Sequence, residues 1–133
     1  MILDTISLAT KNKLNIMHNF KELKIWQKGR KFVKDIYKLT RKFPKEEMFV
    51  LTSQMKRAAI SIPSNIAEGA GRGTNKDFSR FIDMATGSSY ELESLIYVGF
   101  DLEYYSEEEL DVYLEKVQEI QKMLFHFKNH INS

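Results

Sequence analysis

Two histidines near the carboxyl end have the spacing of a metal site on a helix. His126 and His130 stand four residues apart in "HFKNH", so a helix would place both imidazoles on one side. A zinc site needs further ligands, and this stretch lacks the carboxylate of a zinc-binding helix, while the chain has no cysteine. The sequence therefore predicts a pair of surface histidines, with no metal and no cofactor.

Three glycines, Gly69, Gly71 and Gly73, have the density of a phosphate-binding loop. They follow a helical pattern rather than a strand, and no "GKS" or "GKT" accompanies them. We interpret them as a helix stop and turn, with anion binding at the start of the next helix as the lesser alternative. Elsewhere Asp, Glu, Ser and His do not group as a nucleophile, a base and a group that orients the base. We therefore expect no enzyme.

Basic residues dominate one early segment of the chain. Nine Lys and Arg lie between Lys21 and Lys42, against Glu22 and Asp35. At helical spacing six lysines share one face, which could neutralise the phosphates of a nucleic acid or could be a solvated surface. This face consists of Lys24, Lys28, Lys31, Lys34, Lys38 and Lys42. Trp26 could stack a base, although a tryptophan on an apolar flank is more often part of the core.

A line of polar residues runs along one face of a second helical segment. Its members recur at intervals of three and four, beside small apolar residues. One interpretation is a solvated face; the other is a surface that hydrogen-bonds a second subunit or a ligand. The line consists of Gln54, Arg57, Ser61, Ser64, Asn65, Glu68 and Arg72.

Apolar residues recur at three and four throughout, which predicts an all-α fold with four helices. We expect the first helix over residues 19–43 and the second from Lys45 to the glycines. The inward face of the first consists of Ile25, Phe32, Val33, Ile36, Leu39, Thr40 and Phe43. The second carries Met48, Leu51, Met55, Ala58, Ile62 and Ile66 inward and is expected to be kinked at Pro63.

Hydrogen-bonding residues mark the starts of the third and fourth helices. Thr74 with Asp77 resembles a capping box, and Ser106 precedes three glutamates. The third helix is expected to face inward with Phe78, Phe81, Ala85, Ser88, Leu92, Leu95 and Gly99, with a close helix approach at Ala85, Gly87 and Ser88. The fourth is expected to do so with Leu110, Tyr113, Val117, Ile120, Leu124, Phe127 and Ile131.

Short connections between such helices predict an antiparallel up-down-up-down four-helix bundle over residues 17–133. Residues 1–16 lack the pattern and are expected to be an N-terminal appendage; Met17 could be the true start, which would make them a translated leader. The absence of cysteine and of a long apolar run favours a cytoplasmic protein that does not insert into a membrane.

The stretch from Asn19 to Ile96 resembles a known family, the four-helix-bundle proteins of 23S ribosomal RNA intervening sequences. The resemblance is carried by "ELKIWQK" with Leu23 and Trp26, by "FPKEE", by "SQMKRAAISIPSNIAEGAGR" and by "FIDMATGSSYELE". It implies a cytoplasmic bacterial protein that forms a homopentameric ring and has no known catalysis. The family is similar to the accessory protein of diversity-generating retroelements, which binds nucleic acid and a reverse transcriptase through a basic surface.

Charge is divided unevenly along the chain, and this leaves two functions open. Residues 1–60 carry 14 Lys and Arg against 5 Asp and Glu, whereas residues 61–133 carry 6 against 13. The leading hypothesis is a non-catalytic homo-oligomer that binds nucleic acid, preferring RNA, through the six lysines. The alternative is a homo-oligomeric interaction scaffold without nucleic-acid binding, whose basic face meets the acidic fourth helix of a neighbouring subunit or an acidic protein.

Overall fold

The computed structural model describes residues 19–132 and contains four long helices in that range. They are α2 (Lys24–Thr40), α3 (Leu51–Ala70), α4 (Asn75–Asp101) and α5 (Glu107–Asn132). Two short 3₁₀ turns, η2 (Phe20–Glu22) and η3 (Lys45–Glu47), precede α2 and α3. No strand occurs in this part of the chain, so the predicted all-α fold is confirmed. The expected appendage of residues 1–16 lies outside the described residues.

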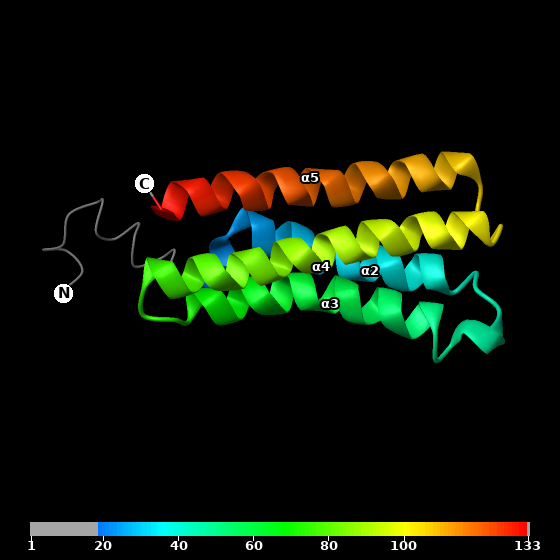
Figure 1. The fold of residues 1–133 in the computed structure, drawn as a ribbon, viewed down its shortest axis with the longest axis horizontal. Coiled ribbons are helices and arrows are strands. Elements are labelled where there is room, and N and C mark those ends of the chain that lie inside the picture. Colours follow the sequence, from blue (N-terminus) through cyan, green and yellow to red (C-terminus); the bar gives the residue numbers. More distant parts are fainter. Residues whose placement is uncertain (1–18, 133) are drawn as a thin grey trace, which may run out of the picture.

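The four helices lie lengthwise beside one another, and the colour gradient along the chain reverses from each helix to the next (Figure 1). Neighbours in sequence pack together, and α2 closes the set by packing against α5. The contact between α2 and α5 is the loosest of the four. A groove can therefore form along that seam, and the sequence places its lysines there.

The predicted apolar stripes of the first and fourth helices face the core, with Val33, Tyr113 and Phe127 only partly buried against it. Ile36 of α2 and Val117 and Leu124 of α5 are fully buried. The stripe of α4 is confirmed at Phe78, Ala85, Leu92 and Gly99. It differs from the prediction elsewhere, because Ile82, Ser89 and Ile96 are buried while Phe81, Ser88 and Leu95 are only partly covered. The reason is tertiary: α4 packs against α3 on one side and α5 on the other, so its buried arc is centred between them.

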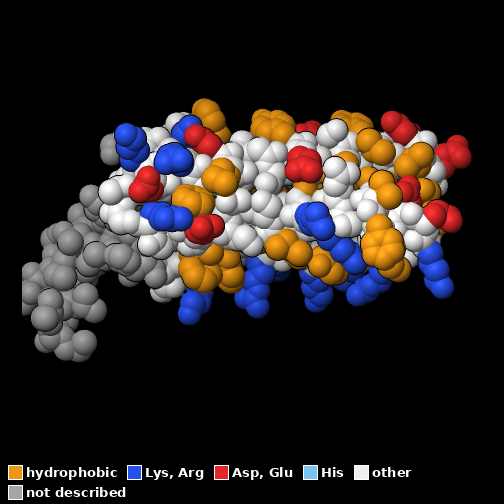
Figure 2. Space-filling model, turned by 60° about the horizontal axis from the view of Figure 1, so that its bottom comes forward, with side chains coloured by type: hydrophobic (Ala, Val, Ile, Leu, Met, Phe, Trp, Pro, Cys, Tyr) orange, Lys and Arg blue, Asp and Glu red, His pale blue; other side chains and the backbone are white. Residues whose placement is uncertain are grey.

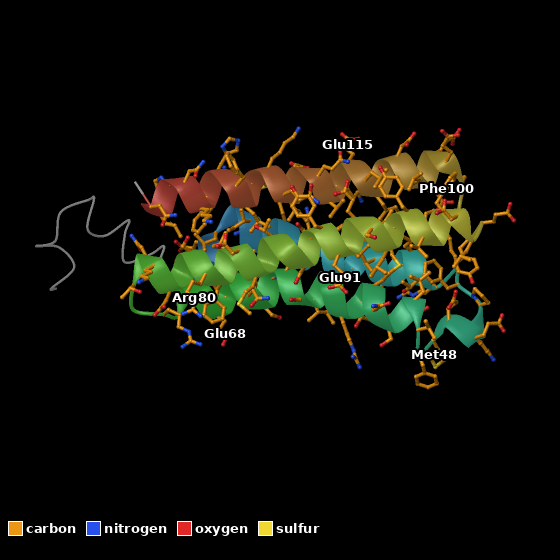
Figure 3. The ribbon with its side chains drawn as sticks, viewed as in Figure 1. Met48, Glu68, Arg80, Glu91, Phe100 and Glu115 are labelled. Carbon is orange, nitrogen blue, oxygen red and sulfur yellow. The ribbon has the colours of Figure 1, made fainter. Side chains whose placement is uncertain are left out.

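The predicted start of the second helix is wrong. We expected it near Lys45, but η3 and a turn occupy residues 45–50, and Val50, at φ −119° and ψ −97°, separates them from α3. Met48, expected to face inward, is 52% exposed at this corner (Figure 3). The Tyr104 hydroxyl donates a hydrogen bond of 2.7 Å to the Glu47 carboxylate and thereby ties η3 to the turn after α4. This bond raises the pKa of Tyr104 to about 12.

Pro63 lies inside α3, which continues through it as an α-helix. Ser61 and Ser64 flank Pro63 and are placed to bond the backbone groups that a proline frees. Instead the Ser61 hydroxyl lies 2.7 Å from that of Ser88 on α4, and Asn65 donates to the Ser61 carbonyl at 2.8 Å. The predicted kink at Pro63 stays a prediction.

The predicted helix stop and turn between α3 and α4 is confirmed, because α3 ends at Ala70 and Gly71 is its C-cap, but Gly69 has a different role. No glycine of the described chain has a positive φ, so Gly71 ends α3 without a left-handed residue. Gly69 is instead needed for close packing, since a Cβ there would lie 2.7 Å from Cβ of Phe81. Gly87, expected at a close approach, faces open space. Thr74 caps α4 as predicted, accepting a hydrogen bond of 3.1 Å from the backbone N–H of Asp77.

We expect replacement of Glu103 by glycine to stabilise the protein. Glu103 ends α4 with a φ of 65°, where a side chain costs about 1–2 kcal/mol that glycine avoids. After the larger entropy loss of glycine on folding, a gain of about 0.5–1 kcal/mol remains. Urea unfolding measures it. Glu103→Ala is the control, because it removes the carboxylate and keeps the strain; an equal gain in that variant would contradict the explanation.

Candidate nucleic-acid interface

All six lysines of the predicted basic face are exposed, five of them on α2 and Lys42 just after it. They project outward because Ile25, Phe32 and Ile36 hold the opposite side of α2 in the core. Figure 2 shows Lys and Arg side chains projecting in a row along one long edge of the molecule. At 1.5 Å per residue, the row from Lys24 to Lys38 is about 21 Å long. It can therefore meet several phosphates at once.

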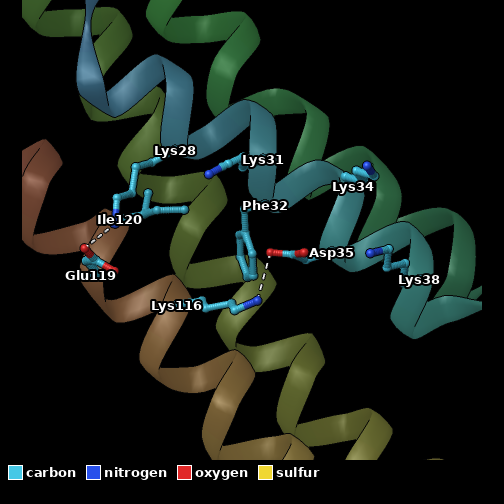
Figure 4. Close-up of a pocket in the computed structure, with 9 residues that line it drawn as sticks. All are labelled: Lys28, Lys31, Phe32, Lys34, Asp35, Lys38, Lys116, Glu119 and Ile120. Carbon is cyan, nitrogen blue, oxygen red and sulfur yellow. Dashed lines mark hydrogen bonds and ion pairs between the residues drawn. The ribbon is translucent and has the colours of Figure 1, made fainter.

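The row borders a groove between α2 and α5 (Figure 4). A cavity of about 500 Å³ lies there, with Phe32 and Ile120 as its apolar residues. Its remaining lining is charged and comes from both helices: Lys28, Lys31, Lys34, Asp35, Lys38, Lys116 and Glu119. The fold thus adds Lys116 to the predicted lysines. Sequence reasoning missed it because it stands in an acidic segment, and only the packing of α5 on α2 brings it to this groove.

Carboxylates of the bundle already pair with some of these lysines. Lys28 contacts Glu119 at 2.6 Å, with the two side chains 48% and 51% exposed. Lys116 contacts Asp35 at 3.0 Å across the same groove. Exposed pairs contribute only about 0.2–1 kcal/mol, so a phosphate can compete for these ammonium groups. Lys42 pairs with Glu109 of α5.

The remaining four lysines make no ion pair with another described residue: Lys24, Lys31, Lys34 and Lys38. They form the unpaired lysine row. Three of them also border a second, adjoining hollow of about 670 Å³, to which Arg30 and Met123 contribute. Arg30 was missed as a site residue because it lies off the lysine face, toward α3.

We expect replacement of Lys42 by methionine to raise the pKa of Glu109. The Lys42 ammonium, chiefly through its hydrogen bond, holds that pKa below the usual range for a carboxyl group. A carboxyl group whose pKa is lowered by folding stabilises the folded state at any pH above its pKa in the unfolded chain. This stabilisation is lost as the pH falls through the pKa of the folded state. Carbon-13 NMR titration measures Glu109 directly. Lys38→Met is the control and should leave the titration unchanged; a low pKa that survives Lys42→Met would contradict the assignment.

The predicted polar line of the second helix is only partly brought together. Ser61 and Asn65 are half-buried and bond each other at 2.9 Å, and Ser61 also bonds Ser88 of α4. The other five members lie exposed on α3 and just beyond it: Gln54, Arg57, Ser64, Glu68 and Arg72. Arg72 pairs with Glu68 at 3.2 Å. Within one chain, Ser61 is therefore the member of the line that hydrogen-bonds a neighbouring helix, and the five exposed members lie on the surface.

The histidine pair lies on the exposed side of α5. The His126 ring contacts that of Phe125 at 5.6 Å between centroids, and His130 is exposed. Within residues 19–132, no group of His, Asp and Glu could hold a metal ion. Over the same range, no helix is long and apolar enough to cross a bilayer.

Comparison with known proteins agrees with the resemblance seen in the sequence. A crystal structure of a protein of unknown function from the S23 ribosomal protein family of Bacteroides thetaiotaomicron VPI-5482 has a similar fold. Its TM-score is 0.73 at 24% identity, over 78% of this chain and 97% of that chain. No functionally curated protein matches the sequence. The model of the 23S rRNA-intervening sequence protein family matches residues 21–126. Because this match covers well over half of the sequence, the chain belongs to the family of 23S rRNA-intervening sequence proteins.

Proposed function

We propose that this protein is a non-catalytic, oligomeric nucleic-acid-binding protein that prefers RNA and binds it through the basic face of α2. The observation that carries the proposal is the unpaired lysine row: four ammonium groups along one helix, without a carboxylate partner among the described residues. An ordinary solvated helix face mixes charges of both signs. A row of one sign attracts a polyanion instead.

Binding of this kind depends on phosphates and only weakly on sequence. Each phosphate that a lysine neutralises releases counterions, so affinity falls as salt rises. Phosphate contacts also position a nucleic acid without reading its bases. RNA is the preferred partner in this proposal because of the family's name. Lys28 and Lys116, which pair with Glu119 and Asp35 in the α2–α5 groove, would contribute further contacts once phosphate displaces those carboxylates.

The test is the salt dependence of RNA binding, measured by fluorescence anisotropy with a labelled single strand. Four contacts predict that the logarithm of the association constant falls with the logarithm of salt with a slope of about −3, at roughly 0.7 per contact. Reading the same titration with RNAs of unrelated sequence should give nearly the same slope and affinity. Absence of binding at low salt, or binding that salt leaves unchanged, would contradict the proposal.

A second candidate function is a homo-oligomeric interaction scaffold, which exposed apolar residues favour. Met84 and Val98 of α4 are 55% and 40% exposed and stand two heptads apart, and Leu102 follows on the same side. Phe49, beside η3, is 88% exposed. Exposed apolar residues that form a contiguous patch mark contacts with another chain, and this candidate function takes the line on α4 as such a patch. The resemblance makes a pentamer the expected assembly, with an acidic protein or a reverse transcriptase as further partners.

Light scattering coupled to gel filtration tests the assembly. The parent should have about five times the chain mass of 15.6 kDa, and Met84→Lys with Val98→Lys should lower it. A variant with Lys31 and Lys38 changed to glutamine serves as the control. If that control dissociates the oligomer and the parent does not bind RNA, the lysines serve subunit contacts and the scaffold is the function.

A further inference from the structure

An apolar pocket lies on the opposite flank of α2 from the α5 groove, between α2 and α3. Its volume is about 420 Å³, within the range of small-molecule sites. Six of its eight lining residues are apolar, and the charged one is an arginine. They are Phe20, Trp26, Arg30, Val33, Ile60, Pro63, Ser64 and Ala67. We call this the Trp26 pocket.

The aromatic wall of the pocket is built by the turn before α2. η2 brings the Phe20 ring edge to face with the Trp26 ring, with 5.0 Å between the two ring centroids. Both rings are only partly buried, and Ile60 on the facing helix is 41% exposed. Phe20 and Trp26 thus pack against the core on one side and present apolar surface to the outside on the other. The sequence allowed Trp26 to be either a core residue or a surface residue that stacks a base. In the structure one part of its side chain is buried against the core and another part is exposed.

Arg30 joins this pocket to the basic surface. Its guanidinium carbon lies 5.4 Å from the Trp26 ring centre, over the ring, and the same side chain lines the hollow that Lys31 and Lys34 border. No carboxylate lines the Trp26 pocket. A ligand that enters it therefore meets apolar surface, an aromatic pair and one positive charge, with two further positive charges next along α2.

We propose that the Trp26 pocket binds an unstacked base of a single-stranded nucleic acid whose phosphates lie along the unpaired lysine row. This inference rests on the proposed function and adds a second part to the site. Bases splayed out of a single strand stack on aromatic rings and on arginine planes, and the charge of Arg30 suits the adjoining phosphate. A duplex keeps its bases stacked and paired, so it can use the lysines but not the pocket.

The charge of Arg30 beside an apolar lining favours this occupant over an apolar segment of a protein. An apolar segment would leave the charge of Arg30 without an anion, whereas a nucleotide uses both the apolar wall and the positive rim. The two parts of the site also differ in what they recognise. The lysine row recognises phosphate in any nucleic acid, while the Trp26 pocket distinguishes a single strand from a duplex.

Trp26 is the only tryptophan of the chain, so its fluorescence reports on this pocket alone. The full chain is titrated with a single-stranded RNA of about 12 nucleotides and, separately, with the same strand annealed to its complement. We expect the single strand to quench the Trp26 emission and the duplex to leave it nearly unchanged. At matched salt, the single strand should also bind about tenfold more tightly than duplex of equal length.

A matched pair of variants tests the pocket itself. Ser64→Leu adds a bulky side chain to the pocket lining, and Ser94→Leu makes the same change at an exposed position of α4 outside it. Ser64→Leu should weaken single-strand binding about tenfold and abolish the quenching, with duplex binding unchanged. Ser94→Leu should bind as the parent does. Circular dichroism and mass are measured for both.

The outcomes separate this inference from the function on which it rests. If single strand and duplex bind equally and neither quenches Trp26, the lysine row functions alone and the Trp26 pocket is no base site. If neither binds, the proposed function fails as well. If Ser64→Leu changes the oligomer mass, a second subunit covers the pocket. If removal of residues 1–16 shifts the Trp26 emission and RNA does not, the chain's own N-terminal segment covers it. Each of the last two results overturns the inference.

Discussion

Replacing Lys31, Lys34 and Lys38 with glutamate is expected to abolish RNA binding, with affinity reduced by at least about a hundredfold at moderate salt. All three belong to the unpaired lysine row, and none is held by a carboxylate of the described chain. The change removes three phosphate contacts and puts three repelling charges in their place. Helicity should not change, because lysine and glutamate have similar helix propensities and all three residues are exposed.

The control for this variant makes the same change in net charge elsewhere. Lys45, Lys76 and Lys122 are exposed and lie outside both grooves of α2. Their replacement by glutamate should weaken RNA binding only through the long-range field, which salt screens. Anisotropy at moderate salt compares the two triple variants with the parent. Equal losses in both would mean that net charge and not position controls binding, and retained binding in the first would refute the nucleic-acid proposal.

Two glycine-to-alanine changes are expected to have opposite effects on stability. Gly69→Ala should destabilise the protein by about 2 kcal/mol, because the new Cβ would lie 2.7 Å from Cβ of Phe81 and 2.9 Å from the ring of Phe78. A Cβ cannot rotate away, so α3 and α4 must separate. Gly87→Ala should stabilise by about 1 kcal/mol, since that position is helical, exposed and without a neighbour within 4 Å.

The two substitutions are chemically identical and lie on the two helices that pack most extensively, so each is the control for the other. Urea unfolding followed by circular dichroism gives both changes in the free energy of unfolding. The expected difference of about 3 kcal/mol is well above the error of such measurements. Stabilisation by Gly69→Ala would mean that the helices do not approach as closely as the structure shows.

The sequence by itself determined the helices, two of their starts and the chemical character of the α2 surface. Periodicity and capping are local properties: Thr74 and Ser106 supply caps whatever lies nearby, and residues spaced at three and four share a face wherever the helix packs. The lysines were predictable for the same reason, because a helix that buries Ile25, Phe32 and Ile36 must expose them. The short connections between the helices predicted the bundle, and the family resemblance implied the same fold.

Tertiary structure decided the features that depend on which helices pack together, namely the ion pairs of the lysines and the buried side of α4. Whether Lys28 and Lys42 are paired was decided by α5, which brings Glu119 and Glu109 to them from far along the chain. The inward side of α4 depended on its two neighbours, and Tyr104 bonds Glu47 only because the turn after α4 meets η3.

The glycines and Trp26 show the same division between local pattern and packing. Gly69 and Gly87 look alike in sequence, yet only Gly69 has a phenylalanine against it. Trp26 became part of a pocket because η2 and α3 lie beside it. A sequence pattern specifies which face of a helix is apolar or charged. Distances between residues far apart in the chain arise only when the faces pack, and in this protein those distances shape the candidate site.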